Sequence, residues 1–289
     1  MRKNPFVKLS ACILPLALSV SGCTGEKSNE IEIMTLNIRC ETPGDGINSW
    51  TNRAPVAAVF INKSRPALLG MQEVTWNQYR YLDSALSGYE SVMPCGPEGF
   101  KKGIANPVFY LRSEFKPAGS GLFWLSATPG VEGSTGWGAA YPRTAIWVKL
   151  VQKTTGDTIL FINTHFDHKS DSARINEVSV LRQELGKIAS GNDFIITGDF
   201  NASPESPAVK MMLDDTLIKN SFLISETRPA GPYDTFNGWS QAPGKGRIDY
   251  IMVRSGMMVK SCRTLKVIKD SIFISDHWPV TAKVRFGTI

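Results

Sequence analysis

The three histidines of this chain all lie beside carboxylate or amide side chains. His165 and His168 belong to the stretch Asn-Thr-His-Phe-Asp-His at residues 163–168, and His277 directly follows Asp276. A histidine beside a carboxylate can transfer a proton near neutral pH, because the carboxylate orients the ring and favours its charged form. Each histidine taken singly is more often structural, so it is the grouping that indicates acid–base chemistry.

Carboxylates and amides also end several strongly apolar runs. Asp199 and Asn201 follow the run at residues 194–197, Glu73 ends another run, and Asn37 lies near the end of the first one. In a strand, Asp199 and Asn201 would share one face, although an Asx turn that closes the strand is the structural alternative. A carboxylate or amide in such apolar surroundings is costly unless it is paired or bound to a cation.

The oxygen-bearing side chains form a set that suits a hard divalent ion. Mg²⁺ and Mn²⁺ prefer carboxylate oxygens and also bind the oxygens of a substrate phosphate, whereas zinc usually requires more His or Cys. Such an ion lowers the energy of the negative charge that accumulates during attack on phosphorus. The set comprises Asn37, Glu73, Asp199, Asn201, Asp249 and Asp276, with His277 as the proton-active group.

Short apolar runs that alternate with helix-like segments must position these groups. From residue 31 onward the pattern predicts one α/β domain over residues 31–289, without a long linker or an internal repeat. Helices are expected at residues 54–63 and 172–190, where the second has apolar residues at helical spacing. Strands are expected at residues 31–38, 67–74, 158–163, 193–197, 248–253 and 279–286. Because these runs are apolar on both faces, two packed sheets flanked by helices are expected.

Composition limits the class of protein more than it identifies the substrate. The chain has 289 residues, of which 42% are hydrophobic, which is enough for one substantial core. Its formal charge of +6 falls to +3 when the three cations Arg2, Lys3 and Lys8 are removed with the N-terminal segment. This small surplus is compatible with an anionic substrate, but it lacks the basic stripe of a protein that binds nucleic acid mainly by charge.

The N-terminal segment has the features of an export signal. It has a basic start, an apolar middle at residues 11–20 that is short for a spanning helix, and small residues before Cys23. The ending Val-Ser-Gly-Cys resembles the lipobox of bacterial lipoproteins. We therefore expect a signal peptide at residues 1–22, a lipidated Cys23 with a tether over residues 23–30, and anchoring to a membrane on its periplasmic side or at the cell surface. Ordinary signal cleavage and a retained membrane anchor are the alternatives.

Three cysteines remain in the expected mature chain: Cys40, Cys95 and Cys262. One pair could be bridged in an oxidising compartment, but the sequence does not say which. No Cys/His spacing indicates a zinc site. Buried free thiols are the default expectation.

The order of the polar motifs resembles the endonuclease/exonuclease/phosphatase superfamily, which is DNase I-like. The matching motifs are Gln72-Glu73, Gly198-Asp199-Phe200-Asn201, Arg247-Ile248-Asp249-Tyr250 and Ser275-Asp276-His277-Trp278-Pro279. Residues 123–126 and 136–147 are similar to a bacterial secreted branch of that superfamily. The resemblance covers nearly the whole mature chain. It implies a four-layered α/β sandwich, with two packed mixed β-sheets flanked by helices.

The resemblance also implies a role for each matched residue. Glu73 would be the principal metal ligand, with Asn37 and Asp276 helping directly or through water. Asp249 would hydrogen-bond His277, fix its tautomer and favour its protonated form.

The remaining matched residues would bind the phosphate and the attacking water. Asp199 would orient or deprotonate the water, while Asn201 and His165 would hold phosphate oxygens; the general base could be Asp199 or His277. Related enzymes commonly place a Glu shortly before residue 107 to orient the equivalent of His165. That Glu is absent here, so Asp167 or Asn106 would have to replace it.

Three further side chains are candidates for substrate contact: Arg143, His168 and Trp239. A structural salt bridge is the alternative for Arg143, and packing beneath a loop is the alternative for Trp239.

We therefore expect a Mg²⁺- or Mn²⁺-dependent, monomeric hydrolase of a phosphodiester or phosphomonoester outside the cytoplasm. Nucleic acid, a nucleotide, an inositol phosphate and a phospholipid head group all remain open as substrates. A non-catalytic surface binding lipoprotein with the same fold is the competing class, since a fold alone does not establish chemistry.

Overall fold

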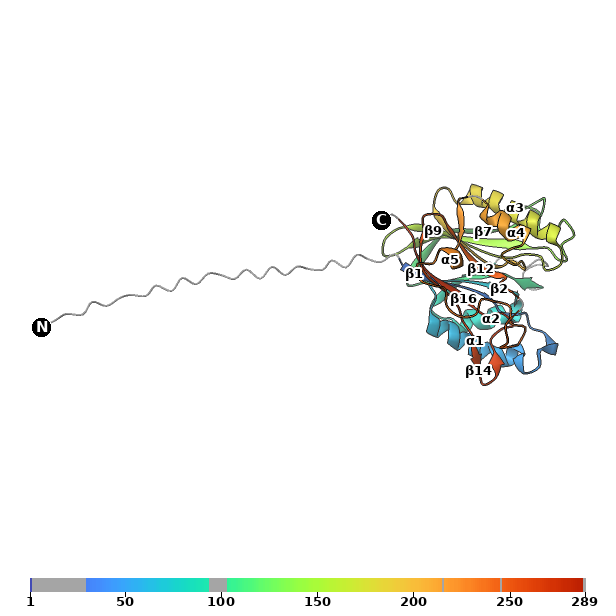
Figure 1. Ribbon diagram of the computed structural model, residues 1–289, viewed down its shortest axis with the longest axis horizontal. Coiled ribbons are helices and arrows are strands. Elements are labelled where there is room, and N and C mark those ends of the chain that lie inside the picture. Colours follow the sequence, from blue (N-terminus) through green and yellow to red (C-terminus); the bar gives the residue numbers. More distant parts are fainter. Residues whose placement is uncertain (2–29, 94–102, 215, 245, 288–289) are drawn as a thin grey trace.

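The computed structural model describes residues 1, 30–93, 103–214, 216–244 and 246–287 (Figure 1). The predicted signal peptide beyond its first residue, the lipid site at Cys23, the tether up to residue 29 and Cys95 lie outside the described residues. Within the described part of the chain, no helix is long and apolar enough to cross a membrane.

Two six-stranded mixed sheets form the centre of the fold. In the first sheet the order is β13 (Met258–Thr264), β16 (Val280–Arg285), β1 (Glu30–Asn37), β2 (Leu68–Gln72), β6 (Val108–Leu111) and β4 (Tyr89–Val92). In the second it is β11 (Ile218–Asn220), β12 (Asp249–Arg254), β10 (Asp193–Asp199), β9 (Thr158–His165), β8 (Thr144–Gln152) and β7 (Phe115–Trp124). Only β1 with β2 and β9 with β10 run parallel among these pairs of the described residues.

Helices cover the outer faces of both sheets (Figure 1). On one side lie α1 (Trp50–Ser64) and α2 (Trp76–Ala85), and on the other lie α3 (Asp171–Ile188) and α4 (Pro207–Leu213). The smaller elements are η1 (Pro43–Asn48), α5 (Ser221–Ile224), the pair β3 (Val74–Thr75) with β5 (Ile104–Ala105), and the pair β14 (Ile268–Lys269) with β15 (Ile272–Phe273). The predicted four-layered α/β sandwich is confirmed.

Strand β10 shows why its sequence is apolar on both faces. Ile195 belongs to the core that joins the two sheets, whereas its neighbours Phe194 and Ile196 belong to the core beneath α3 and α4. Helix α3 contributes Val178 and Leu181 to that second core. Burial of such a side chain stabilises the fold by about 1.5–3 kcal/mol, so β10 is held firmly from both sides. Rigid support of this kind matters because β10 ends at Asp199.

The predicted elements are present, with two differences. The strand expected over residues 67–74 is interrupted at Glu73, whose φ of 60° ends β2 and turns the chain before β3. Left-handed backbone costs a non-glycine residue about 1–2 kcal/mol and is typical of functional sites. The long strands β7 and β8 were not predicted from sequence, since β8 alternates buried with half-exposed residues and β7 is largely exposed. Cys262 is buried as expected but Cys40 is only half-buried, and both are free.

Candidate active site

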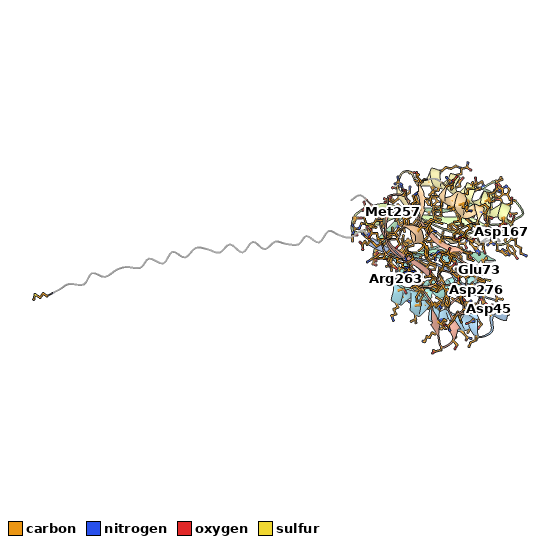
Figure 2. All side chains as sticks on the ribbon, in the orientation of Figure 1. Asp45, Glu73, Asp167, Met257, Arg263 and Asp276 are labelled. Carbon is orange, nitrogen blue, oxygen red and sulfur yellow. The ribbon has the colours of Figure 1, made fainter. Side chains whose placement is uncertain are left out.

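The candidate residues converge because the two parallel strand pairs end at the same end of the sandwich. Asn37 and Gln72 are paired at the ends of β1 and β2. In the second sheet Asp199 is paired with His165 across the parallel ladder and with Asp249 across the antiparallel one. Figure 2 shows Glu73 and Asp276 at this end, whereas Met257 lies at the opposite end.

The amide of Asn37 joins the two sheets at the centre of the site. Its Nδ2 donates to Glu73 Oε1 at 3.2 Å and to Asp199 Oδ2 at 3.0 Å, and the side chain is fully buried. The backbone N–H of Cys40 donates to Glu73 Oε2 at 3.2 Å. Burial opposes ionisation of Glu73, but the positive charge of His277 and these two donors lower its pKa to about 2. Glu73 is therefore a carboxylate at neutral pH.

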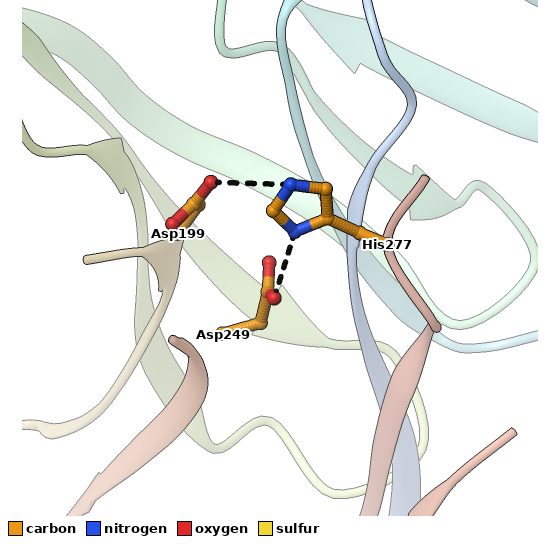
Figure 3. A group of neighbouring side chains, drawn as sticks. All are labelled: Asp199, Asp249 and His277. Carbon is orange, nitrogen blue, oxygen red and sulfur yellow. Dashed lines mark hydrogen bonds and ion pairs between the residues drawn. The ribbon is translucent and has the colours of Figure 1, made fainter. Parts of the chain in front are cut away.

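His277 lies between two carboxylates (Figure 3). Its Nδ1 is 2.9 Å from Asp249 Oδ2, and its Nε2 is 3.8 Å from Asp199 Oδ2. Burial alone would lower the pKa of His277, but Asp249 and Asp199 raise it well above the ordinary value. The ring of Phe236 packs edge-on against the imidazole at 5.0 Å. His277 is therefore held as a cation whose Nε2–H points toward Asp199.

Asp199, in contrast to His277, is an acid whose pKa is raised mainly by its own burial. Burial, followed by the charge of Asp249, raises its pKa to about 7, although His277 and the hydrogen bonds from Asn201 and Asn37 oppose the rise. The backbone N–H of Asn201 donates to Asp199 Oδ1 at 2.9 Å. Asp199 can therefore accept and release a proton near neutral pH.

His165 is uncharged and lies beside Asn201. Asn201 Nδ2 is 2.9 Å from His165 Nε2 and donates to the carbonyl of Phe166 at 3.0 Å. Burial, then the nearby charge of Arg143, lower the pKa of His165 well below its ordinary value. His165 and the amide of Asn201 are therefore neutral groups beside Asp199. The distance from His165 Nε2 to Asp199 Oδ2 is 3.6 Å.

The expected replacement for the missing Glu is wrong. Asp167 accepts hydrogen bonds from the backbone N–H groups of Ala140, Lys169 and Ser170, and Asn106 donates to the carbonyl of Thr144 at 3.5 Å. Neither side chain hydrogen-bonds His165, and His165 Nδ1 is buried without a partner among the described residues. The carboxylate of Asp167 is used instead to fold the loop that follows β9.

The loop after β15 brings Asp276 and His277 to Asn37. Ser275 Oγ donates to the carbonyl of Asn37 at 2.6 Å and accepts from the N–H of His277 at 3.1 Å. Asp276 Oδ2 lies 3.8 Å from Arg39 Nε. Burial, then the charge of Glu73, raise the pKa of Asp276, and His277 and Arg39 oppose the rise.

This donor set fits a hard divalent cation. The carboxylates lie close together, with His277 and Arg39 as the cations in direct ion-pair contact with them. A dication that bound their oxygens would reduce the repulsion between the carboxylates. Asp199, Asp249 and His277 also place ligand-type atoms within 4.8 Å of one another, but a direct hydrogen bond already joins Asp249 to His277. The carboxylates are Glu73, Asp199, Asp249 and Asp276.

Arg143 and His168 adjoin the site beyond His165. Arg143 Nη2 is 3.0 Å from His168 Nδ1, and Arg143 Nε is 3.7 Å from Asp167 Oδ2. The exposed ring of Tyr141 stacks on His168 at 5.9 Å. Arg143 is only 6% exposed, so its charge is held in place next to His165.

Trp239 does not lie among these groups. Its ring packs on the guanidinium of Arg53 at 5.5 Å and against Phe273 at 6.3 Å. The neighbouring Gly238 N–H donates to the carbonyl of Asp276 at 3.0 Å. Its contacts are therefore those of the packing alternative.

Sequence reasoning missed the residues that hold the site together. Thr235 Oγ1 accepts from the N–H groups of Ile248 and Asp249 at 2.9 and 3.1 Å. Arg53 and Thr235 are buried polar residues that act on the backbone, and nothing in their local sequence distinguishes them from surface residues. Ser275 belongs to a motif that the sequence shows, but its role in binding the backbone was not predicted. A polar residue that lies far along the chain from its partner gives no periodic signal.

Comparison with known proteins gives a consistent result. The sequence model described as the Endonuclease/Exonuclease/phosphatase family matches residues 34–277. A solved protein of that description from Bacteroides vulgatus is 29% identical, with a TM-score of 0.85 over 89% of this chain and 99% of that one. A mannosyl-6-phosphatase from Bacteroides thetaiotaomicron is 27% identical, with a TM-score of 0.83 over 89% of this chain and all of that one.

A more distant structure shares the fold. The human Nocturnin catalytic domain is 22% identical, with a TM-score of 0.71 over 90% of this chain and 96% of that one. No curated protein sequence matches the chain at a significant level.

Proposed function

The chain belongs to the endonuclease/exonuclease/phosphatase family, and on that basis we propose that it is a divalent-metal-dependent phosphoesterase. Members of this family act on phosphate esters. One observation supports the proposal most strongly: a single buried amide, Asn37, contacts both Glu73 and Asp199, and Asp199 in turn lies 3.8 Å from His277. A cation-binding group and proton-transfer groups are thereby brought to one place.

Glu73, Asn37 and Asp276 would hold Mg²⁺ or Mn²⁺. Glu73 is ionised at neutral pH, since its pKa is about 2, and the backbone N–H of Cys40 fixes one of its oxygens. When bound, such an ion would stabilise the negative charge that develops on phosphate oxygens.

Asp199 would orient and deprotonate the attacking water. A general base is most effective when its pKa is near the working pH, and the pKa of Asp199 is about 7. The N–H of Asn201 and the amide of Asn37 hold the carboxylate, so its free lone pairs have a fixed direction.

His277 would donate its Nε2–H to a phosphate oxygen. Asp249 holds the opposite ring nitrogen at 2.9 Å, which keeps the ring protonated and oriented. Asn201 and His165 would contact further phosphate oxygens. A preorganised donor of this kind is typically worth about 10²- to 10³-fold in rate.

Arg143 and His168 would bind phosphate oxygens of the substrate that are neither attacked nor released. Next to His165, the charge of Arg143 is better matched to a doubly charged phosphomonoester than to a singly charged diester. A small phosphorylated compound, including a sugar phosphate or an inositol phosphate, is therefore the first candidate, and nucleic acid or a phospholipid head group is the second. The similarity to a mannosyl-6-phosphatase supports the same order.

Export and lipidation at Cys23 complete the proposal, with the domain working as a monomer outside the cytoplasm. The Val-Ser-Gly-Cys ending of the first 23 residues supports it. Labelling of the wild type with a radioactive fatty acid, lost in Cys23→Ala, is the expected result. A soluble, unlabelled wild type would contradict it.

A substrate screen tests the enzymatic proposal. Purified protein with Mg²⁺ or Mn²⁺ is assayed on sugar phosphates, inositol phosphates, nucleotides, DNA, RNA and phospholipids. We expect turnover that requires the metal and disappears with chelator and in His277→Ala. Binding of one of these compounds without any turnover would favour the non-catalytic surface protein instead.

A further inference from the structure

Arg53 is a fully buried cation on α1 that donates to backbone carbonyls of three separate segments. Its Nε donates to the carbonyl of Asn48 at 2.6 Å, and Nη1 donates to the carbonyls of Ile38 at 2.5 Å and Ile274 at 2.9 Å. Nη2 donates to the carbonyl of Arg39 at 3.1 Å. The side chain is 0% exposed, so water cannot replace these bonds.

Three of the four carbonyls that Arg53 binds lie next to predicted metal ligands. Ile38 and Arg39 directly follow Asn37, while Ile274 lies two residues before Asp276. Ile274 and Arg53 are separated by 221 residues along the chain. One rigid guanidinium therefore sets the distance between the turn after β1 and the turn that bears Asp276.

The guanidinium itself is fixed by two aromatic rings. Its carbon lies 5.4 Å from the ring centre of Trp50 and 5.5 Å from that of Trp239. Burial lowers the pKa of Arg53 to about 10, with Asp45 and Asp276 opposing the decrease, so it stays charged at neutral pH. Arginine suits this place because its donors form a planar fork, which the single nitrogen of lysine cannot reproduce.

We propose that Arg53 is a positioning residue that sets the affinity of the site for its divalent cation. It touches neither the ion nor the substrate; it acts through the backbone on either side of Asn37 and Asp276. This inference rests on the metal-dependent function proposed above. Groups that orient metal ligands from behind typically change metal affinity by about 10- to 100-fold when they are mutated.

The chain contains a matched control in Arg247. This second arginine is 1% exposed, donates to the carbonyl of Tyr233 and to Thr264 Oγ1 at 3.3 and 3.2 Å, and packs on Phe222 at 4.2 Å. Its replacement disturbs an equally buried place. None of the residues that it contacts borders Asn37, Glu73 or Asp276.

The test compares Mn²⁺ binding by substrate-free wild type, Arg53→Lys and Arg247→Lys, measured by calorimetry and by the loss of the free Mn²⁺ electron paramagnetic resonance signal. Thermal unfolding of each protein without metal measures the stability lost. We expect both variants to lose stability, but only Arg53→Lys to bind Mn²⁺ about 10-fold or more weakly. Equal metal affinities in the two variants would overturn the inference.

A milder change keeps the inference testable if Arg53→Lys does not fold. Trp239 is half-buried at the outer face of the guanidinium, so Trp239→Leu should fold and loosen Arg53. We expect Mn²⁺ affinity to fall about 3-fold, and an unchanged affinity would count against the inference. A wild type that binds no divalent ion would instead refute the proposed function, which makes the two failures distinguishable.

Discussion

The site has two halves, and they are built differently. In the proton-transfer half, formed by Asp199, Asp249 and His165 with His277 beside them, three of the side chains are placed by direct strand pairing. In the metal half, formed by Asn37, Glu73 and Asp276, only Asn37 belongs to a strand. Strand register fixes the positions of these residues in the proton-transfer half. The positions of Glu73 and Asp276 in the metal half depend instead on buried side chains that hydrogen-bond to the backbone.

The distinction predicts separable defects. Damage to the proton-transfer half should lower the rate and leave the cation bound, since Asp199, Asp249 and His165 are positioned by the second sheet. Damage to the metal half should weaken cation binding first, because its turns are held by Arg53 and Ser275. Each of the following predictions tests this separation or the residues next to the two halves.

The largest expected effect is in the proton-transfer half. His277→Ala should lower kcat by about 10²- to 10⁴-fold, because the Nε2–H donor is lost. Asp249→Asn should have a smaller effect, since the ring remains but the charge that favours its protonated form is gone. Steady-state kinetics with saturating Mg²⁺ measures both. A His277→Ala enzyme that retains more than about a tenth of the wild-type kcat would remove His277 from the chemistry.

The second-largest expected effect concerns Arg143, which lies at the edge of the proton-transfer half next to His165. Arg143→Met should lower kcat/KM on a phosphomonoester by about 10- to 100-fold, since a charged hydrogen bond is worth about 1.5–3 kcal/mol and 1.4 kcal/mol is tenfold. The loss on bis-p-nitrophenyl phosphate should be smaller, because a diester has one charge fewer. Lys169→Met, which removes an exposed neighbouring cation, is the control and should change neither value by more than about 2-fold. Equal losses on both substrates would remove the preference for a monoester.

The smallest expected effect is a pH dependence of stability. It concerns Glu177, which lies behind the loop of Asp167 next to Arg143. Glu177 is 0% exposed and accepts the N–H of Asp167 at 2.9 Å. Its other oxygen is buried and has no hydrogen-bond partner in the part of the chain that the structure describes. Burial raises its pKa from 4.5 to about 7. Because the folded state holds this proton to a higher pH than the unfolded state does, the stability that it contributes is lost as pH rises from about 4.5 to 7.

Glu177→Gln should remove that dependence. Each pKa unit corresponds to 1.36 kcal/mol, and the substituted amide forfeits part of the gain, so we expect the variant to be more stable than wild type by roughly 2 kcal/mol or less at pH 8. Urea unfolding at pH 5 and pH 8 measures the difference. Glu184→Gln on the same helix, where the carboxylate pairs with Lys187 at the surface, is the control. A wild type and Glu177→Gln that lose stability in parallel between these pH values would contradict the assignment.

The same contrast explains what could be predicted from sequence. Asp199 follows a run that is apolar on both faces, so a buried strand that ends in a polar site could be read directly. Its pairing with Asp249 could not, because register between strands 50 residues apart depends on the whole sheet. The left-handed turn at Glu73 was also out of reach, since it is imposed by tertiary contacts against the local preference.

The role of Arg53 could not be predicted from the sequence at all. Arginine on a helix usually faces solvent, and only the folded chain shows that four carbonyls surround this one. The missing partner of His165 is a similar case. The absence of a Glu could be seen in the sequence, but the use of Asp167 for the following loop could not.

One comparison of two variants tests the two-half site most directly. Mn²⁺ binding and turnover are measured side by side for wild type, Glu73→Gln and His277→Ala. We expect Glu73→Gln to lose Mn²⁺ binding, and His277→Ala to bind Mn²⁺ within about 3-fold of wild type while its turnover falls by at least about 100-fold. Loss of Mn²⁺ binding in His277→Ala, or its retention in Glu73→Gln, would contradict the division.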